Sequence, residues 1–198
     1  MLKVGLTGNI GSGKSLIAEL FSIYGIPIYY ADQEAKKFYD DPFVKEQIIS
    51  LFGGRILDES GEISRKTLAK IVFTDEKALA KLDSIIHPMV IDDFENWCEL
   101  KRESPYVIHE AAIIFESGNK AIFDSIIHVS CPREIAIERV IKRDGVDSNE
   151  VLQRMHFQME DDEKAKLSDF VIQNDGSEMI IPQVLVIHEQ LLKFDKQD

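Results

Sequence analysis

The first fifteen residues, MLKVGLTGNIGSGKS, constrain this chain more than any other stretch. Within them GNIGSGKS, from Gly8 to Ser15, matches the pattern G-x-x-x-x-G-K-[S/T]. An apolar strand at residues 3–7 precedes the match, and from Lys14 onward apolar residues recur at the spacing of an amphipathic helix. A strand, this loop and a helix in that order are the context that the pattern requires. The sequence therefore predicts a phosphate-binding loop in an α/β protein.

Each residue type in this loop has a chemical reason to be there. The glycines let the backbone turn so that its N–H groups point inward toward phosphate oxygens, and the following helix adds the positive end of its dipole. Lys14 can reach the β- and γ-phosphates of a nucleotide, and the Ser15 hydroxyl can bind Mg²⁺. The predicted nucleotide contacts are Gly8, Asn9, Ile10, Gly11, Ser12, Gly13, Lys14 and Ser15. The alternative is a glycine-rich turn without a ligand.

The overall composition limits the partners that such a loop can serve. The 198 residues carry a formal net charge of −12, which argues against non-specific nucleic-acid binding. Any phosphate site must therefore be local. No apolar run approaches the roughly 18 residues needed to span a bilayer, the N-terminus lacks the features of a signal peptide, and the two cysteines form no metal-like pair. We expect a cytoplasmic protein without membrane or nucleic-acid partners, and nothing indicates an obligate protein partner.

Strand-like and helix-like stretches alternate along the rest of the chain. Four further stretches are typical of strands: 26–30, 106–110, 125–130 and 169–174. Three more helices are expected, beginning near Asp32, Arg133 and Ser177. Strands separated by helices favour a parallel sheet covered on both faces.

Two segments differ from this alternating pattern. Residues 33–104 are mostly helical and charged, and are broken by turn signals at 40–42, 52–54, 58–62 and 87–88. They are predicted to form an inserted helical subdomain that binds an acceptor. The charged segment 144–166 is predicted to be a helical lid. The core is then formed by residues 1–32, 105–143 and 167–198.

Protein classes that use this loop differ in size and in their second motif. A switch GTPase would carry N-K-x-D, but the nearest string, NKAI at 119–122, lacks the aspartate. A motor or pump ATPase would be larger. A small chain with an inserted helical block suggests a kinase of a small metabolite, in which ATP is the donor and a lid closes over it. A nucleotide or nucleoside kinase and a non-catalytic nucleotide-binding switch remain the alternatives.

Six strings occur in a distinctive order and spacing: GLTGNIGSGKS, YYAD, IIHPMV, IIFE, VSCPREIAIERVIKRD and SDFVIQNDG. Over nearly the whole chain they resemble the dephospho-coenzyme A kinases. The resemblance implies transfer of the ATP γ-phosphoryl group, with Mg²⁺, to the ribose 3′-hydroxyl of dephospho-coenzyme A, the last step of coenzyme A synthesis. It also implies the three-layer fold of P-loop nucleoside-triphosphate hydrolases, with a central parallel sheet, an inserted helical acceptor-binding subdomain and a helical lid.

Three positions depart from the family pattern. Asn9 stands where the family usually has a second glycine, Tyr30 where it often has the first acid of D-A-D, and Ala112 where many members have proline. None of the three removes a group that the chemistry needs.

Asp32 is the predicted catalytic base and an acceptor-binding residue. It follows the second strand, at the edge of the sheet where open α/β sheets bind ligands. A carboxylate there can accept the proton of the attacking hydroxyl, and the matching aspartate of the family has this role. The alternatives are that Asp32 caps the next helix or acts through Mg²⁺.

Three cations at spacing i, i+3 and i+4 share one face of a predicted helix: Arg139, Lys142 and Arg143. Such a face could clamp a triphosphate as charge spreads over its oxygens. The family's lid arginine falls at Arg139, which is predicted to be catalytic and, with Arg143, to contact the nucleotide. Arg154 is a further candidate. The alternative is a solvated face paired with neighbouring acids.

The remaining candidates rest mainly on the resemblance. Asn174 ends the last strand, where the family's asparagine lies by the adenine of ATP, although Asn-Asp-Gly also forms a good turn. His87 and the proline after it match a pair near the family's acceptor pocket, although a packed or capping histidine is the alternative. Glu110 and Glu116 are candidates for a water-mediated contact to Mg²⁺.

Overall fold

The computed structural model describes residues 1–194, and the chain divides into two compact units. The first unit combines Met1–Tyr30 with the chain from Trp97 onward and holds the β-sheet. The second unit is the helical stretch Ala31–Asn96.

The helical unit occupies most of the predicted insertion, 33–104, with shifted edges. Trp97 belongs to the sheet unit because its ring packs edge-on against Tyr29 of a strand, with centroids 5.5 Å apart. That the helical unit binds an acceptor, and that 144–166 is a lid, stay predictions.

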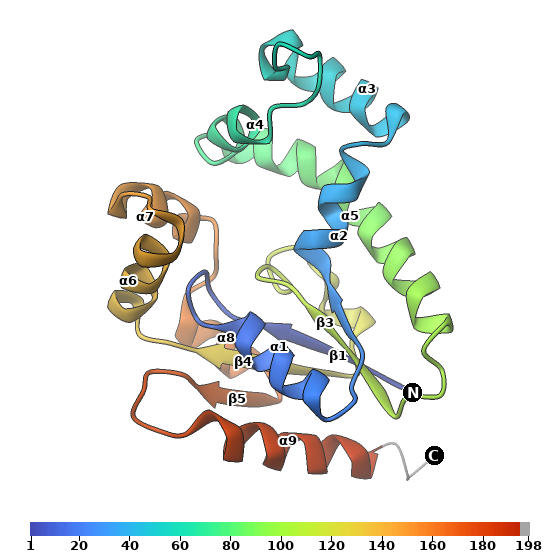
Figure 1. The fold of residues 1–198 in the computed structure, drawn as a ribbon, viewed down its shortest axis with the longest axis vertical. Coiled ribbons are helices and arrows are strands. Elements are labelled where there is room, and N and C mark those ends of the chain that lie inside the picture. The colour runs from blue at the N-terminus through green and yellow to red at the C-terminus, as the bar shows by residue number, and fades with distance from the viewer. Residues whose placement is uncertain (195–198) are drawn as a thin grey trace. The chain divides into compact units, whose positions relative to one another are not determined.

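Five parallel strands form the sheet, in the order β2-β3-β1-β4-β5 (Figure 1). Their bounds are β1 Leu2–Thr7, β2 Ile28–Tyr30, β3 Tyr106–Glu110, β4 Ser125–Ser130 and β5 Phe170–Gln173. Every residue of β3 and the last four of β1 are buried, which is the pattern of a parallel sheet with both faces covered. The five predicted strands are confirmed, and β3 and β4 have the predicted bounds.

The helices of the sheet unit are α1 Lys14–Ile23, α6 Arg133–Asp144, α7 Ser148–His156, α8 Asp161–Leu167 and α9 Ile180–Phe194, with the short 3-10 helix η2 Asn119–Ile122. Leu6 and Ile127 lie opposite each other and join a core with side chains of α1 and α9. The next pair, Thr7 and His128, faces the other way, where α8 packs on β4. The predicted layers of helix, parallel sheet and helix are therefore confirmed (Figure 1). α9 begins at Ile180, later than the expected Ser177.

The helical unit contains α2 Ala31–Phe38, α3 Pro42–Phe52, η1 Gly54–Ile56, α4 Arg65–Val72 and α5 Glu76–Glu99, of which the last runs on into the sheet unit. The turn signal at 40–42 marks the start of α3. Asp41 caps this helix by accepting hydrogen bonds from the N–H groups of Phe43 and Val44, and Pro42 occupies the first turn. Ser64 caps α4 in the same way.

The turn predicted at 87–88 is wrong, because Pro88 lies inside α5. A proline in a helix interior removes one hydrogen bond and is locally unfavourable. Buried residues nevertheless recur at every fourth position on both sides of it: Ala78, Leu82, Ile86, Val90, Phe94 and Cys98. This continuous apolar stripe stabilises the helix across the proline.

Within residues 1–194, no helix combines the length and the apolar character that crossing a membrane would need. The cytoplasmic location expected from the sequence stays a prediction.

Candidate active site

The loop between β1 and α1 is packed against two other parts of the sheet unit. Gly11 has a φ of 82°, and a Cβ there would lie 2.3 Å from the carbonyl oxygen of Ala136 on α6. Gly13 has a φ of 94°, and a Cβ there would lie 2.2 Å from Nδ2 of Asn174. Both the positive φ and the close approach require glycine. The loop is therefore held between α6 and the end of β5.

Lys14 begins α1 and turns back over the loop. Its Nζ donates to the carbonyl oxygens of Gly8, at 2.9 Å, and Asn9, at 3.4 Å. The ammonium group therefore lies against the loop, whose C-terminal end is the start of α1. Cation, N–H groups and helix dipole together favour a bound anion.

Ser15, the predicted magnesium ligand, is the second residue of α1 and is exposed. In residues 1–194, no group of three or more His, Cys, Asp and Glu side chains is arranged to hold a metal ion. Binding of Mg²⁺ by Ser15 stays a prediction.

Asn174 supports the loop from the end of β5. It is 6% exposed, its Nδ2 donates to the carbonyl oxygen of Ser12 at 2.6 Å, and its backbone N–H donates to Ser130 at 2.9 Å. The structure thus brings Asn174 to the phosphate loop. Its predicted contact with the nucleotide stays a prediction.

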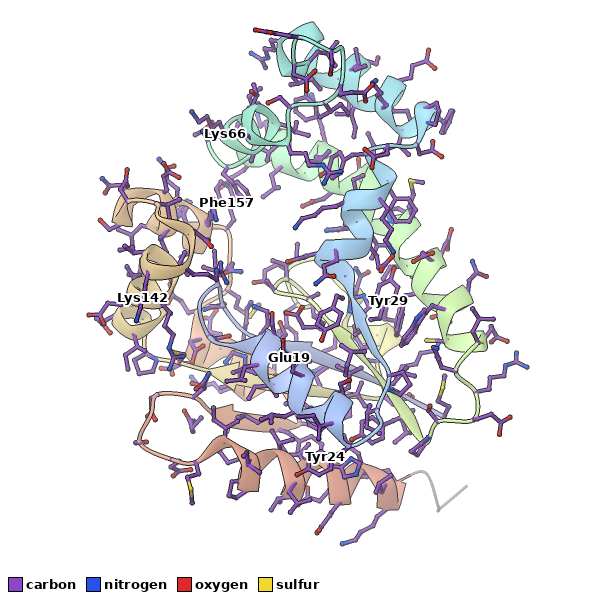
Figure 2. All side chains as sticks on the ribbon, in the orientation of Figure 1. Glu19, Tyr24, Tyr29, Lys66, Lys142 and Phe157 are labelled. Carbon is purple, nitrogen blue, oxygen red and sulfur yellow. The ribbon has the colours of Figure 1, made fainter. Side chains whose placement is uncertain are left out.

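The positively charged side chains of α6 have different partners. Arg139 points its guanidinium at Sγ of Cys131, 3.4 Å away, and lies 4.0 Å from a Cβ placed on Gly13. Arg143 instead forms two hydrogen bonds to the carboxylate of Asp144, at 2.7 and 2.8 Å. Figure 2 labels Lys142 on the same helix, and its side chain is exposed. Arg139 therefore lies beside the loop, whereas Arg143 is paired with an acid at the surface.

The alternative for this helix, a cation paired with a neighbouring acid at the surface, is found at Arg143. Its hydrogen bonds to Asp144 lower the pKa of that carboxyl group, and Arg154 approaches the same carboxylate at 3.7 Å. A nucleotide contact by Arg143 or Arg154 stays a prediction.

Two residues that sequence reasoning missed hold the loop from the connection between α7 and α8. The backbone N–H of Ile10 donates to Oε1 of Gln158 at 2.9 Å, and Nδ2 of Asn9 donates to the carbonyl oxygen of Met159 at 3.2 Å. Asn9, the position that departs from the family pattern, has a negative φ and is used for its side chain. No local sequence signal links positions about 150 residues apart.

A buried ion pair also supports the connection between α7 and α8. Lys164 of α8 is 0% exposed, and its Nζ lies 2.7 Å from both Oε1 of Glu116 and the carbonyl oxygen of Ala112. Glu116 also accepts the N–H of Met159 at 2.8 Å. Burial lowers the pKa of Lys164, while Glu116 raises it. Glu116 therefore has a structural partner in this lysine, and its water-mediated contact with Mg²⁺ stays a prediction.

Asp161 ties α8 to β4. Its carboxylate accepts from the Ser130 hydroxyl at 2.5 Å and lies 3.1 Å from Nε2 of the fully buried His128. Burial alone would raise the pKa of Asp161, but the hydrogen bonds of His128 and Ser130 outweigh it and hold that pKa below its ordinary value. Asp161 thus ties α8 to β4, whereas Lys164 ties it to the segment that follows β3.

Asp32 and His87 both lie in the helical unit. Asp32 is exposed in the first turn of α2, inside the helix rather than at the residue before it, so its charge complements the helix dipole without capping the end. His87 lies 3.4 Å from the carboxylate of Asp83, one turn earlier on α5. Burial raises the pKa of Tyr39, and the charges of Asp83 and Asp32 raise it further. Asp32 and Asp83, the ion-pair partner of His87, therefore both act on the pKa of Tyr39.

Gly11→Ala is expected to abolish ATP binding and to destabilise the protein. Gly25 has the same φ of 82° but open space around its Cβ position, so Gly25→Ala is a matched control for the backbone penalty alone. We expect Gly11→Ala to lower the free energy of unfolding by about 1–3 kcal/mol more than Gly25→Ala, because the new methyl group meets backbone that must shift. Denaturant unfolding and ATP titration measure both effects. Equal stability losses with ATP binding retained would contradict the packing described for this loop.

The chain was compared with family models, with known proteins and with solved structures. A family model for dephospho-CoA kinase matches residues 2–179. The dephospho-CoA kinase of Aquifex aeolicus (strain VF5) is 40% identical over 195 residues, which cover 98% of this chain and 99% of the relative. A crystal structure from Thermus thermophilus is 33% identical with a TM-score of 0.83 and covers 96% of both chains. Dephospho-CoA kinase from Campylobacter jejuni is 25% identical with a TM-score of 0.68 and covers 98% of both chains.

These matches extend over the phosphate loop, the helical unit and most of the sheet unit. One match rests on a family pattern, one on pairwise sequence identity and two on the course of the backbone. The chain therefore belongs to the dephospho-CoA kinase family.

Proposed function

We propose that this chain transfers the γ-phosphoryl group of ATP to the ribose 3′-hydroxyl of dephospho-coenzyme A, which is the last step of coenzyme A synthesis. Membership of the family supports the acceptor. The assignment of ATP as the donor rests on the loop at residues 8–15, in which Lys14 lies over a glycine turn that precedes a helix.

The donor half of the proposed reaction uses the loop and one arginine. The N–H groups and Lys14 hold the β- and γ-phosphates. Ser15 would hold a Mg²⁺, which would supply positive charge to the phosphate oxygens. Arg139, beside Gly13, stabilises charge that builds up on the γ-phosphoryl group during transfer. Positioning and electrostatics of this kind supply most of the catalysis in phosphoryl transfer.

Two residues of the helical unit are assigned to the acceptor half of the reaction. Asp32 takes the proton of the 3′-hydroxyl while the 3′-oxygen forms a bond to the γ-phosphorus. The bond from that phosphorus to the bridging oxygen breaks, and ADP leaves with the electron pair. His87, oriented by Asp83 one turn away, contacts the acceptor.

The proposed lid is narrower than the charged segment 144–166. α8 packs on β4, to which the Asp161 carboxylate ties it, so we assign closure over the donor to α7 and the turn before it. Closure would exclude water, which otherwise competes with the acceptor hydroxyl for the phosphoryl group.

The test is turnover of Mg²⁺-ATP by the purified protein with and without dephospho-coenzyme A. We expect ADP and coenzyme A to form in equal amounts with this acceptor. We expect no ADP above background with nucleosides or nucleoside monophosphates. Turnover of those compounds instead would identify a nucleotide or nucleoside kinase. ATP binding without turnover of any acceptor would identify a non-catalytic nucleotide-binding protein, and either result would refute the proposal.

A further inference from the structure

The first half of the phosphate loop is tied to a segment far along the chain. We call residues 158–159, between α7 and α8, the stem. Its Gln158 side chain accepts the N–H of Ile10 at 2.9 Å, and its Met159 carbonyl accepts Nδ2 of Asn9 at 3.2 Å. One bond uses the loop backbone and the other uses a loop side chain. Two adjacent loop residues are therefore fixed to two adjacent stem residues.

The stem is itself held in place from the other side. The N–H of Met159 donates to Glu116 at 2.8 Å, and the same carboxylate pairs with the fully buried Lys164. Lys164 also donates to the carbonyl oxygen of Ala112, which accepts the hydroxyl of Thr7 at 3.3 Å. Thr7 directly precedes the loop. The stem thus rests on groups of the sheet unit that do not belong to the loop.

The Ile10–Gln158 bond has a direct consequence for the loop. An N–H that donates to Gln158 holds the loop in shape, and the remaining N–H groups of the turn can then point at phosphate. A glycine-rich loop loses more conformational freedom on ordering than other loops do. Contacts that order the loop before the ligand arrives reduce the entropy cost of binding.

We propose that Gln158 and Asn9 are positioning residues for the nucleotide, which keep the first half of the phosphate loop in its binding shape. Neither touches the reacting atoms. Asn9 contributes through a side chain that the glycine usual in the family lacks. The inference rests on the proposed binding of ATP by this loop, and it assigns that binding two further determinants.

The decisive variant is Gln158→Met, which keeps the length of the side chain and removes the acceptor. We expect the Kd of Mg²⁺-ATP, measured by calorimetry, to rise about fivefold, the effect of one lost hydrogen bond. kcat at saturating ATP and the KM for dephospho-coenzyme A should stay unchanged. Asn9→Gly, which removes the other bond, should also raise the Kd of ATP. The matched control is Gln190→Met, an exposed glutamine on α9 that should leave all three constants unchanged.

The outcomes separate this inference from the proposed function. If the unaltered protein neither binds ATP nor turns over dephospho-coenzyme A, the proposed function fails. If it does both and the Kd of ATP in Gln158→Met and Asn9→Gly is unchanged or lower, this inference alone is overturned. A fall in kcat and melting temperature with an unchanged Kd for ATP would indicate only a structural role and would also overturn it. Because the two variants alter different bonds, failure of one to fold leaves the other as the test.

Discussion

Asp32→Asn is expected to lower kcat for coenzyme A formation by about two to four orders of magnitude, the range that a positioned general base contributes. The amide has nearly the same size as the carboxylate but cannot take the proton of the 3′-hydroxyl. ATP affinity should stay close to that of the unaltered protein, because Asp32 belongs to the first turn of α2 and lies outside the phosphate loop. Initial rates at saturating ATP and dephospho-coenzyme A measure the effect on kcat, and calorimetry measures ATP binding.

A control on the same helix separates loss of the base from loss of one negative charge. Glu34 also lies in the first turn of α2 and pairs with Lys37 at the surface, so Glu34→Gln changes the charge by the same amount. We expect Glu34→Gln to keep nearly full turnover. If Asp32→Asn retains the turnover of this control, Asp32 is not the base and the acceptor half of the mechanism must be reassigned.

The parts of the fold that the sequence predicted well are those whose signal is local and redundant. β3 and β4 each contain a short apolar core, Val107–Ile108 and Ile126–Ile127, which is typical of a strand buried on both faces of a parallel sheet. α1 begins at Lys14 as expected, because the glycine loop and the apolar spacing after it both indicate a helix start there. Two independent patterns that agree leave little room for error.

Pro88 was mispredicted because two signals conflicted. The proline disfavours a helix interior at one position, whereas the buried stripe from Ala78 to Cys98 favours a helix over the whole of α5. Burying each large apolar side chain contributes about 1.5–3 kcal/mol, so several such residues outweigh one proline. A prediction that sums apolar periodicity over the full segment would have placed His87 on a helix.

The contacts around the phosphate loop could not be predicted in this way. Gln158 and Lys164 lie in a charged stretch that looks like a solvated surface, yet Lys164 is 0% exposed. Their partners, Ile10, Glu116 and Ala112, are distant in sequence. Periodicity reports which face of a helix is apolar, but it does not report which polar side chain is buried with a partner. The loop was therefore predictable, and the groups that hold it were not.

Lys164→Met is expected to be the most destabilising single change outside the apolar core. The variant leaves the Glu116 side chain, which is 18% exposed, and the carbonyl oxygen of Ala112 without the ammonium group that now lies 2.7 Å from each. Removing one partner of a buried ion pair typically costs about 3–5 kcal/mol, because the other partner stays desolvated. For a chain of this size we expect the melting temperature to fall by roughly 6–20 °C. Thermal and denaturant unfolding measure the loss.

Two further variants show whether the buried charge is the cause. Lys166 lies on the same helix and is exposed, so Lys166→Met controls for a lost lysine on α8 and should leave stability nearly unchanged. Adding Glu116→Gln to Lys164→Met removes the carboxylate that was left without its partner, and should recover part of the lost free energy of unfolding. If Lys164→Met and Lys166→Met unfold alike, the ion pair contributes nothing to stability. The stem that rests on Glu116 would then need another anchor.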